Sequence, residues 1–217
     1  MPQNIFPQNI KETEIGDNPY FNLFDMSMRF FTKTFTYHRD SYALGIYIVY
    51  HSRMPQTISN LCLGLPDRFK TNYHQFLIED GTDSNQHPIY KYVDGPGFIH
   101  TFYYVSSSLY YCSGDELYLY FDNQSNYPST IAFSNGDKLR FDSSGRLVRI
   151  ENGFDSDNIK TITYNNQGRL SSIIDERKPL DSIGFTYTRQ KLASINFWEN
   201  LSFCLPYSLY FLYWFVF

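Results

Sequence analysis

The chain of 217 residues is long enough for one sizeable hydrophobic core or two small ones, and its 42% hydrophobic and 18% charged residues are ordinary for a globular protein. Its 20 Tyr and 20 Phe suit a pleated, half-buried surface, which favours β structure. A net charge of -4 without a run of Lys or Arg argues against nucleic acid and against a polybasic membrane patch.

The N-terminal segment, residues 1–19, has no basic stretch followed by an apolar run, so it lacks the pattern of a secretory signal peptide. We expect this segment to be disordered. The sequence by itself leaves the localisation of the protein open.

Strand signals dominate the next hundred residues. Runs rich in aromatic and β-branched residues, several of them alternating with period two, lie at 30–37, 44–50, 100–105 and 116–121. Between the runs are turn sequences rich in Gly, Asn and Asp, such as 79–88 and 94–97. We find no convincing amphipathic helix. The pattern predicts an all-β chain of antiparallel strands joined by short turns.

A phrase then recurs with a period of about 23 residues. "FDSSGRLVRI" begins at Phe141, "YNNQGRLSSI" begins at Tyr164, and a degraded copy, "YTRQKLASI", begins at Tyr187. An atypical first copy lies at 121–131. Drift in the terminal copies is typical of repeat arrays. The shared positions, which we take as structural repeat positions, are Phe141, Asp142, Gly145, Arg146, Leu147, Ile150, Tyr164, Gly168, Arg169, Leu170, Ile173, Tyr187, Leu192 and Ile195.

Each copy has the pattern of a β-hairpin. Asp142 can start a turn by bonding its own backbone, and Gly145 and Gly168 can take the left-handed conformation, so replacing either glycine by Val should cost about 1–2 kcal/mol. The spacing of three between Leu147 and Ile150 breaks strict alternation, which indicates a bulge or a bend. One hairpin cannot bury its aromatic face alone, so the copies must stack into a sheet. The expected turns are centred on 142–145, 165–168 and 188–190.

The repeated pattern resembles the YD repeat of the RHS (rearrangement hotspot) family: an aromatic residue, Asp or Asn, two residues, Gly-Arg-Leu, two residues and Ile. Residues 150–164 are similar to the family's connector, with Glu151 where Asp is usual, and 92–104 are similar to its Asp-Gly-x-Gly segment. By this resemblance, 20–115 form the strand-rich opening region of an RHS core and 116–196 form the repeats.

Membership of this family implies a long β-sheet that spirals into a hollow shell, secreted or displayed by bacteria and often enclosing a toxic C-terminal domain. The implied partners are the remainder of the shell, a toxin cargo domain and cell-surface glycans, and the implied localisation is extracellular or at the cell surface. We expect this chain to be a truncated product with about three repeats. Its last strand would carry unpaired backbone groups, so we expect self-association through an exposed sheet edge.

Residues with catalytic or metal-binding chemistry show no recognised spacing. The five histidines form no His-Glu-x-x-His or other close ligand pair, and Cys62, Cys112 and Cys204 are too scattered for a disulfide framework or a zinc site. We expect these cysteines to be buried as small apolar residues. Asp115 and Glu116 are expected on opposite faces of a strand, where they cannot form a carboxylate dyad. We therefore predict no enzyme, no cofactor and no metal.

Two functions remain, and a toxin nuclease is disfavoured because no residues support it. The first is a non-catalytic structural segment of an RHS shell, and the alternative is a carbohydrate-binding or adhesion module that uses exposed tyrosines. Residues 197–217 form an apolar tail in which nothing after Glu199 is charged. We expect residues 201–217 to lie outside the repeat sheet, as the product of a shifted reading frame or as a membrane tail, and deletion of residues 200–217 to improve solubility.

Overall fold

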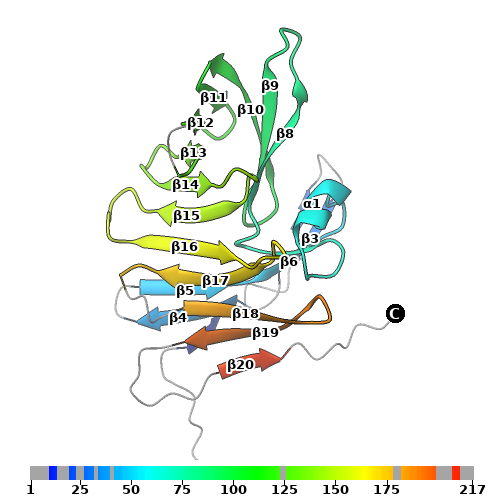
Figure 1. The fold of residues 1–217 in the computed structure, drawn as a ribbon, viewed down its shortest axis with the longest axis vertical. Helices are drawn as coiled ribbons and strands as arrows, with labels where there is room; N and C mark the ends of the chain where they lie inside the picture. Colours follow the sequence, from blue (N-terminus) through cyan, green and yellow to red (C-terminus); the bar gives the residue numbers. More distant parts are fainter. Residues whose placement is uncertain are drawn as a thin grey trace, which may run out of the picture.

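A long antiparallel sheet dominates the computed structural model (Figure 1). The structure describes the backbone of residues 10–13, 20–22, 27–31, 34–39, 42–122, 126–177, 182–198 and 207–210, and the side chains within 45–122, 126–177 and 182–196. Within these residues the chain is mostly strand, with one short helix. The prediction of an all-β chain built of antiparallel hairpins is confirmed.

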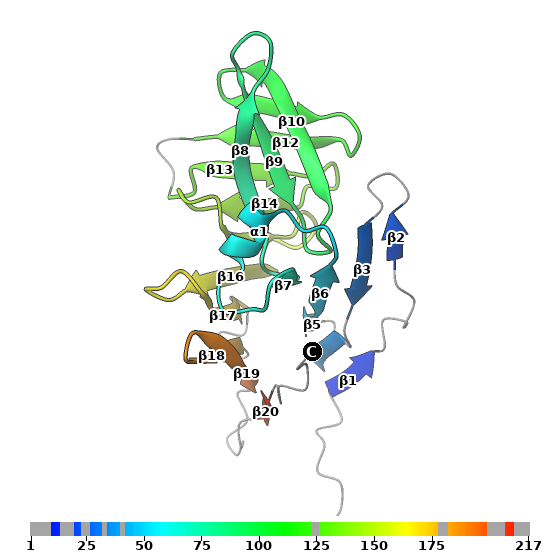
Figure 2. The same cartoon turned by 90° about the vertical axis from the view of Figure 1, so that its right-hand side faces the viewer.

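The long sheet contains thirteen strands, and each strand pairs with its neighbour in the chain, from β8 at one end to β20 at the other. The strand direction turns along the sheet, so that β8 to β10 cross the direction of the later repeat strands (Figures 1 and 2). The strands are β8 (Phe76–Thr82), β9 (Pro88–Val93), β10 (Ile99–Ser106), β11 (Leu109–Cys112), β12 (Leu117–Phe121), β13 (Ser129–Ala132), β14 (Lys138–Phe141), β15 (Leu147–Glu151), β16 (Ile159–Tyr164), β17 (Leu170–Asp175), β18 (Ser182–Thr188), β19 (Lys191–Trp198) and β20 (Tyr207–Tyr210).

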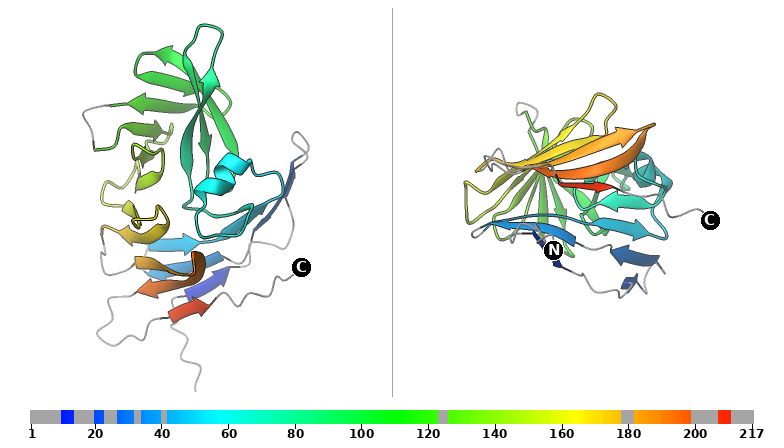
Figure 3. Two further views of the ribbon diagram at one scale, coloured as in Figure 1. Left: turned by 45° about the vertical axis from the view of Figure 1, so that its right-hand side comes forward. Right: turned by 90° about the horizontal axis from the view of Figure 1, so that it is seen from below.

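Two small sheets precede the long one and face its repeat strands as a second layer (Figure 3). One has the order β1–β4–β5 and the other β2–β3–β6–β7. The strand expected at 44–50 is split at Tyr47, whose N–H donates to the Asn72 side chain (3.1 Å) instead of to a neighbouring strand. The strands are β1 (Ile10–Thr13), β2 (Tyr20–Asn22), β3 (Ser27–Phe31), β4 (Thr34–Arg39), β5 (Tyr42–Ile46), β6 (Ile48–His51) and β7 (Phe69–Thr71).

Both chain ends contain strands that were not expected. Residues 10–13, predicted to be disordered, pair with β4 as strand β1, while the rest of 1–19 lies outside the described residues. Residues 207–210 pair with β19 as strand β20, so the prediction that the tail lies outside the sheet is wrong for these four residues. The reason is physical: an edge strand accepts backbone hydrogen bonds from any uncharged extended segment, whether or not the segment carries the repeat phrase.

The helix α1 (Gln56–Leu61) has six residues and begins after Pro55. Ile58 is its buried residue, and it packs with Met54, Cys62, Phe76 and Val93 in a small satellite core. A single buried position gives no helical periodicity, which is why the sequence did not reveal this element. In the described part of the chain, no helix has the length and apolar character needed to span a membrane.

The three predicted repeat hairpins are present. Gly145 and Gly168 have φ of +71° and +75°, as their turns require. In the third copy the loop between Thr188 and Lys191 has only two residues, and Arg189 and Gln190 both take positive φ. This geometry is that of a two-residue hairpin turn of the mirror-image type, which explains how the copy is one residue shorter.

A bulge follows each repeat turn at the same place. Phe141 pairs with Leu147, but the preceding Arg140 pairs with Arg149, so Val148 is an extra residue on its strand. The same register shift leaves Ser171 and Ala193 extra in the second and third copies. The bulge puts residues three apart on one face, which is how each Leu-x-x-Ile pair turns both side chains to the core. The hairpin between β12 and β13, the atypical first copy, pairs without this shift.

The repeat positions build the main hydrophobic core. Its fully buried side chains include Phe141, Leu147, Leu170, Ile173 and Ile195, each no more than 1% exposed. Together with Phe102, Leu119 and Ile131 of the earlier strands they line the inner face of the sheet.

The long sheet also curls back on itself. Phe76 at the start of β8 forms an isolated antiparallel bridge with Arg146, beyond the turn between β14 and β15. The Leu77 N–H donates to the Gly145 carbonyl (2.8 Å), and the Leu147 N–H donates to the Gln75 carbonyl (3.1 Å). One end of β8 is therefore held against the first repeat turn.

Candidate functional site

The polar repeat positions first organise their own turns. Asp142 accepts the backbone N–H groups of Ser144 (2.9 Å) and Arg146 (3.0 Å), and its other carboxylate oxygen pairs with the Arg146 guanidinium (2.7 Å). Asn165 in the second copy accepts the same two turn N–H groups, here from Gln167 and Arg169. The side-chain oxygen of Asp or Asn at this position therefore accepts backbone N–H groups that have no backbone acceptor within the tight turn.

The aromatic repeat positions tie each copy to the one before it. The Tyr164 hydroxyl donates to the Leu147 carbonyl (3.0 Å), and the Tyr187 hydroxyl donates to the Leu170 carbonyl (2.8 Å). Burial raises the pKa of both phenols, so they remain protonated donors. We call this contact the hydroxyl staple. In the copy that begins at Phe141, the aromatic position has no hydroxyl.

The arginine of each Gly-Arg-Leu reinforces the same junction. The Arg146 guanidinium lies 4.6 Å from the centre of the Tyr164 ring, and the Arg169 guanidinium lies 5.3 Å from the centre of the Tyr187 ring. A guanidinium over an aromatic face at such distances is attracted by the ring quadrupole. The repeat therefore uses aromatic and arginine side chains to join copies, in addition to packing their apolar positions.

A cavity of about 550 Å³ lies in the hollow of the curled sheet. Polar side chains from several elements line it, among them Tyr47, Asn72, Gln75, Asp94, His100 and Lys160. Apolar lining comes from the repeat core. The cavity combines a mainly apolar wall with a few polar groups, which is the usual composition of a small-molecule or ion site.

His100, the second residue of β10, lies between two carboxylates at one side of this cavity. Its Nδ1 is 2.7 Å from Asp115 Oδ2, and its Nε2 is 3.2 Å from Asp94 Oδ2. The ring also stacks on Tyr92, with ring centres 5.3 Å apart. Burial alone would lower the pKa of His100, but the hydrogen bonds to both carboxylates outweigh burial and raise it.

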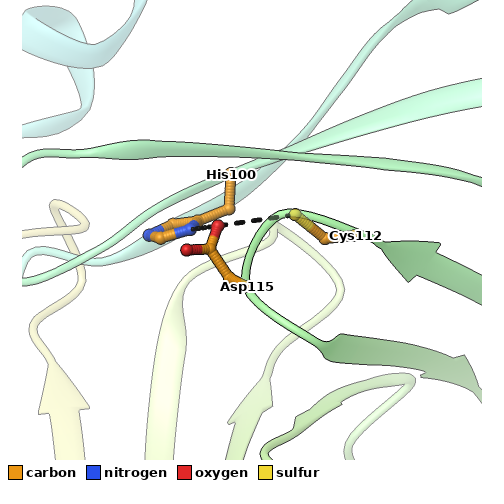
Figure 4. Close-up of side chains that lie close together, drawn as sticks. All are labelled: His100, Cys112 and Asp115. Carbon is orange, nitrogen blue, oxygen red and sulfur yellow. Dashed lines mark hydrogen bonds and ion pairs between the residues drawn. The ribbon is translucent and has the colours of Figure 1, made fainter.

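Cys112 completes the cluster at the end of β11 (Figure 4). Its Sγ is 3.6 Å from Asp115 Oδ2 and donates a weak hydrogen bond to it. Burial raises the pKa of the thiol. A catalytic cysteine is usually activated by a lowered pKa, so the raised pKa of this thiol does not favour a role as nucleophile.

Sequence reasoning missed this cluster and misplaced one of its members. Asp115 and Glu116 lie in the turn between β11 and β12 rather than on a strand, and Glu116 has φ of +54°. The expectation that they point to opposite faces of a strand is therefore wrong. The only sequence signal was the Cys-x-x-Asp spacing after a strand, and His100 lies twelve residues before Cys112 without any shared motif. Cys62 and Cys112 are buried as expected, and Cys204 lies outside the described residues.

A second polar group lies deeper in the sheet. Asp175 is fully buried, and its Oδ2 has no hydrogen-bond partner among the described residues. Its other oxygen accepts the backbone N–H of Arg177 (3.0 Å), and the Lys160 ammonium lies 4.0 Å from Oδ2. Burial lowers the pKa of Lys160, against the opposing effect of Asp175.

Exposed tyrosines gather on the other face of the sheet, over β10 to β12. Tyr103, Tyr118 and Tyr120 are each at least 39% exposed. The rings of Tyr118 and Tyr120 are inclined by 29° with centres 6.3 Å apart, and the centre of the Tyr111 ring lies 4.9 Å from that of Tyr118. We call these four residues the tyrosine platform.

Comparison of the sequence with models of known protein families and with curated proteins finds no match.

Proposed function

We propose that this chain is a non-catalytic wall segment of a hollow β-sheet shell of the RHS kind, in a secreted or cell-surface bacterial protein. The observation that carries the proposal is the repeated junction in which Tyr164 and Tyr187 bond the previous copy's Leu carbonyl under a stacked arginine. A junction that recurs with the same partners lets a sheet grow by adding identical hairpins.

The curvature of the sheet supports enclosure as the role of the array. The inner face buries the apolar repeat positions and surrounds the cavity, while the contact of Phe76 with Arg146 holds the sheet in its curled form. The partners proposed for this wall are further strands of the same shell and an enclosed cargo domain. Self-association through β20, at the end of the strand order, would be the behaviour of the segment alone.

Lengthening the array tests the proposal. A second copy of residues 164–186 is inserted after Thr186, which preserves the period and both chain ends. We expect the longer protein to fold with additional strand signal in circular dichroism and a higher melting temperature, because each stapled junction adds its own interface energy. The matched control has the same insertion, but in the inserted copy Phe replaces the tyrosine equivalent to Tyr164 and Ala replaces the arginine equivalent to Arg169. This control should lose most of the increase in melting temperature.

Failure of the inserted protein to fold, or an equal melting temperature for the stapled and unstapled insertions, would contradict the array proposal. The absence of catalysis is tested separately on the purified chain with nuclease, glycosidase and protease substrates. Activity that a single point substitution abolishes would contradict the non-catalytic part of the proposal.

A second candidate function, carbohydrate binding, is favoured by the tyrosine platform. Neighbouring exposed tyrosine rings can stack on sugar rings. A glycan array probed with the full chain should then show binding that Tyr118→Ala and Tyr120→Ala each remove. Phe154→Ala is the matched control, because Phe154 is an 85% exposed aromatic residue outside the platform. Binding that Phe154→Ala weakens equally would refute the platform as the site.

A further inference from the structure

We propose that His100, Cys112 and Asp115 form a binding site for one zinc-class divalent cation, with a fourth coordination position open to the cavity. This proposal is independent of the wall-segment proposal, because it rests only on the positions of these three side chains. Its ligands come from β10, from the end of β11 and from the following turn, which the antiparallel pairing of β10 with β11 brings together.

The distances suit a tetrahedral ion. One ligand atom from each of His100, Cys112 and Asp115 lies within 4.8 Å of the other two. Zinc bonds of about 2.0–2.3 Å place tetrahedral ligand atoms roughly 3.3–3.7 Å apart. The Sγ to Oδ2 distance of 3.6 Å already meets this requirement. The Nδ1 to Oδ2 distance of 2.7 Å must open by about half an ångström, and the Asp115 side chain, 49% exposed on a turn, has room to do so.

The turn around Cys112 resembles a metal-binding knuckle in the spacing of its ligands. Cys112 and Asp115 are ligands at positions i and i+3, and the intervening Ser-Gly allows the chain to fold back toward the sulfur. Within this turn Cys112 Sγ lies 3.6 Å from Asp115 Oδ2, so the two donor atoms are already neighbours. Metal binding would displace the thiol proton, because the thiolate is the form that binds metal.

Asp94 supplies the outer support that a histidine ligand needs. Its Oδ2 binds Nε2 of His100, which leaves Nδ1 for the cation once the proton on Nδ1 has gone. Asp94 is itself fixed, because its Oδ1 accepts the Phe98 N–H (2.6 Å) and its carbonyl accepts the buried Lys70 ammonium. A ligand orientation set in this way favours metal binding over free rotation of the ring.

The donor set selects the class of ion. One thiolate, one imidazole and one carboxylate suit Zn²⁺ or Co²⁺, whereas Mg²⁺ and Ca²⁺ prefer oxygen ligands alone. His100 and Asp115 both line the cavity, so the remaining coordination position faces it and would hold water or an oxygen of a small ligand.

The test uses the full-length reduced chain, first freed of metal with a chelator and then titrated with Co²⁺ and with Zn²⁺. We expect one cobalt per chain with a thiolate-to-cobalt charge-transfer absorption, and displacement of cobalt by zinc. Cys112→Ser should abolish that absorption, and Asp115→Asn should weaken zinc binding at least tenfold. Asp94→Asn should weaken zinc binding by about 10–100-fold, which is typical of an outer-shell carboxylate.

Two matched controls separate this site from adventitious binding. His87→Gln removes another histidine–carboxylate pair, His87 with Asp83, and Cys62→Ala removes another buried thiol. Both variants should keep the affinity and the cobalt spectrum. Binding should also weaken at least tenfold from pH 7 to pH 6, because the cation displaces protons from His100 and Cys112.

Circular dichroism establishes that each variant is folded. If Cys112→Ser is unstable, Asp115→Asn still tests the site, because the Asp115 side chain is half-exposed. Three results would overturn the proposal: no cobalt absorption in the wild-type chain, zinc binding that survives both ligand substitutions in folded protein, or binding that Cys62→Ala or His87→Gln removes.

Discussion

The contact between the first repeat turn and β8 leads to a sharp prediction about Gly145. This glycine has φ of +71°, and a Cβ added to it would overlap the carbonyl oxygen of Leu77. Gly168 occupies the same turn position in the next copy, but its added Cβ would only touch the ends of the Arg146 and Leu63 side chains at 3.4 Å. Two glycines that look equivalent in the sequence should therefore respond differently to Ala.

The magnitude follows from separate costs. A left-handed non-glycine residue costs about 1–2 kcal/mol, and this cost applies to both positions. At Gly145 the overlap with backbone must also push β8 away, which breaks the hydrogen bonds joining Leu77 to Gly145 and Leu147 to Gln75. At about 1 kcal/mol for each bond, Gly145→Ala should lower the free energy of unfolding by about 3–4 kcal/mol and Gly168→Ala by about 1–2 kcal/mol.

Urea and thermal unfolding followed by circular dichroism measure the difference. For a chain of this size the melting temperature should fall by about 6–16 °C for Gly145→Ala and by about 2–8 °C for Gly168→Ala. Gly81→Ala is the matched control, since Gly81 has φ of +79° and an added Cβ there meets nothing within 4 Å. Equal losses at Gly145 and Gly81 would refute the reasoning, because they would leave no energy for the contact with β8.

Three further changes test other features of the molecule. Tyr164→Phe removes the hydroxyl staple to the Leu147 carbonyl and should reduce the free energy of unfolding by about 1 kcal/mol in urea titrations; no loss would show that the staple is energetically neutral. Burial lowers the pKa of His74 to about 3, against about 6.5 unfolded, so below pH 6.5 the unfolded chain binds a proton that the folded chain does not. The contribution of His74 to stability should therefore decrease as the pH falls, by about 2 kcal/mol at pH 5, and His74→Gln should flatten this part of the pH profile. Deleting residues 200–217 removes β20 and uncovers the longer β19, so light scattering should show more self-association rather than the improved solubility that the apolar composition predicts; an unchanged monomer would show that β20 does not protect this edge.

The repeat hairpins were predictable because all their determinants are local. Asp142 and Gly145 select the turn, and the Leu147 to Ile150 spacing indicates the bulge, within ten consecutive residues. Recurrence after 23 residues then predicts that the copies stack. The hydroxyl staple could not be predicted in the same way. Tyr164 donates to a backbone carbonyl seventeen residues earlier, and because every residue has such a carbonyl, the sequence does not mark this acceptor.

The sequence by itself therefore determined the all-β class, the repeat turns and the apolar positions of the core, since turn chemistry and side-chain alternation act between near neighbours. Only the tertiary structure decided which edges are covered and which polar groups meet. Pairing of β10 with β11 brings His100 to Cys112 and Asp115, and curling of the sheet brings Leu77 to Gly145. These contacts depend on strand register and sheet curvature, which are set by the summed packing of many residues and leave no motif at the positions that they join.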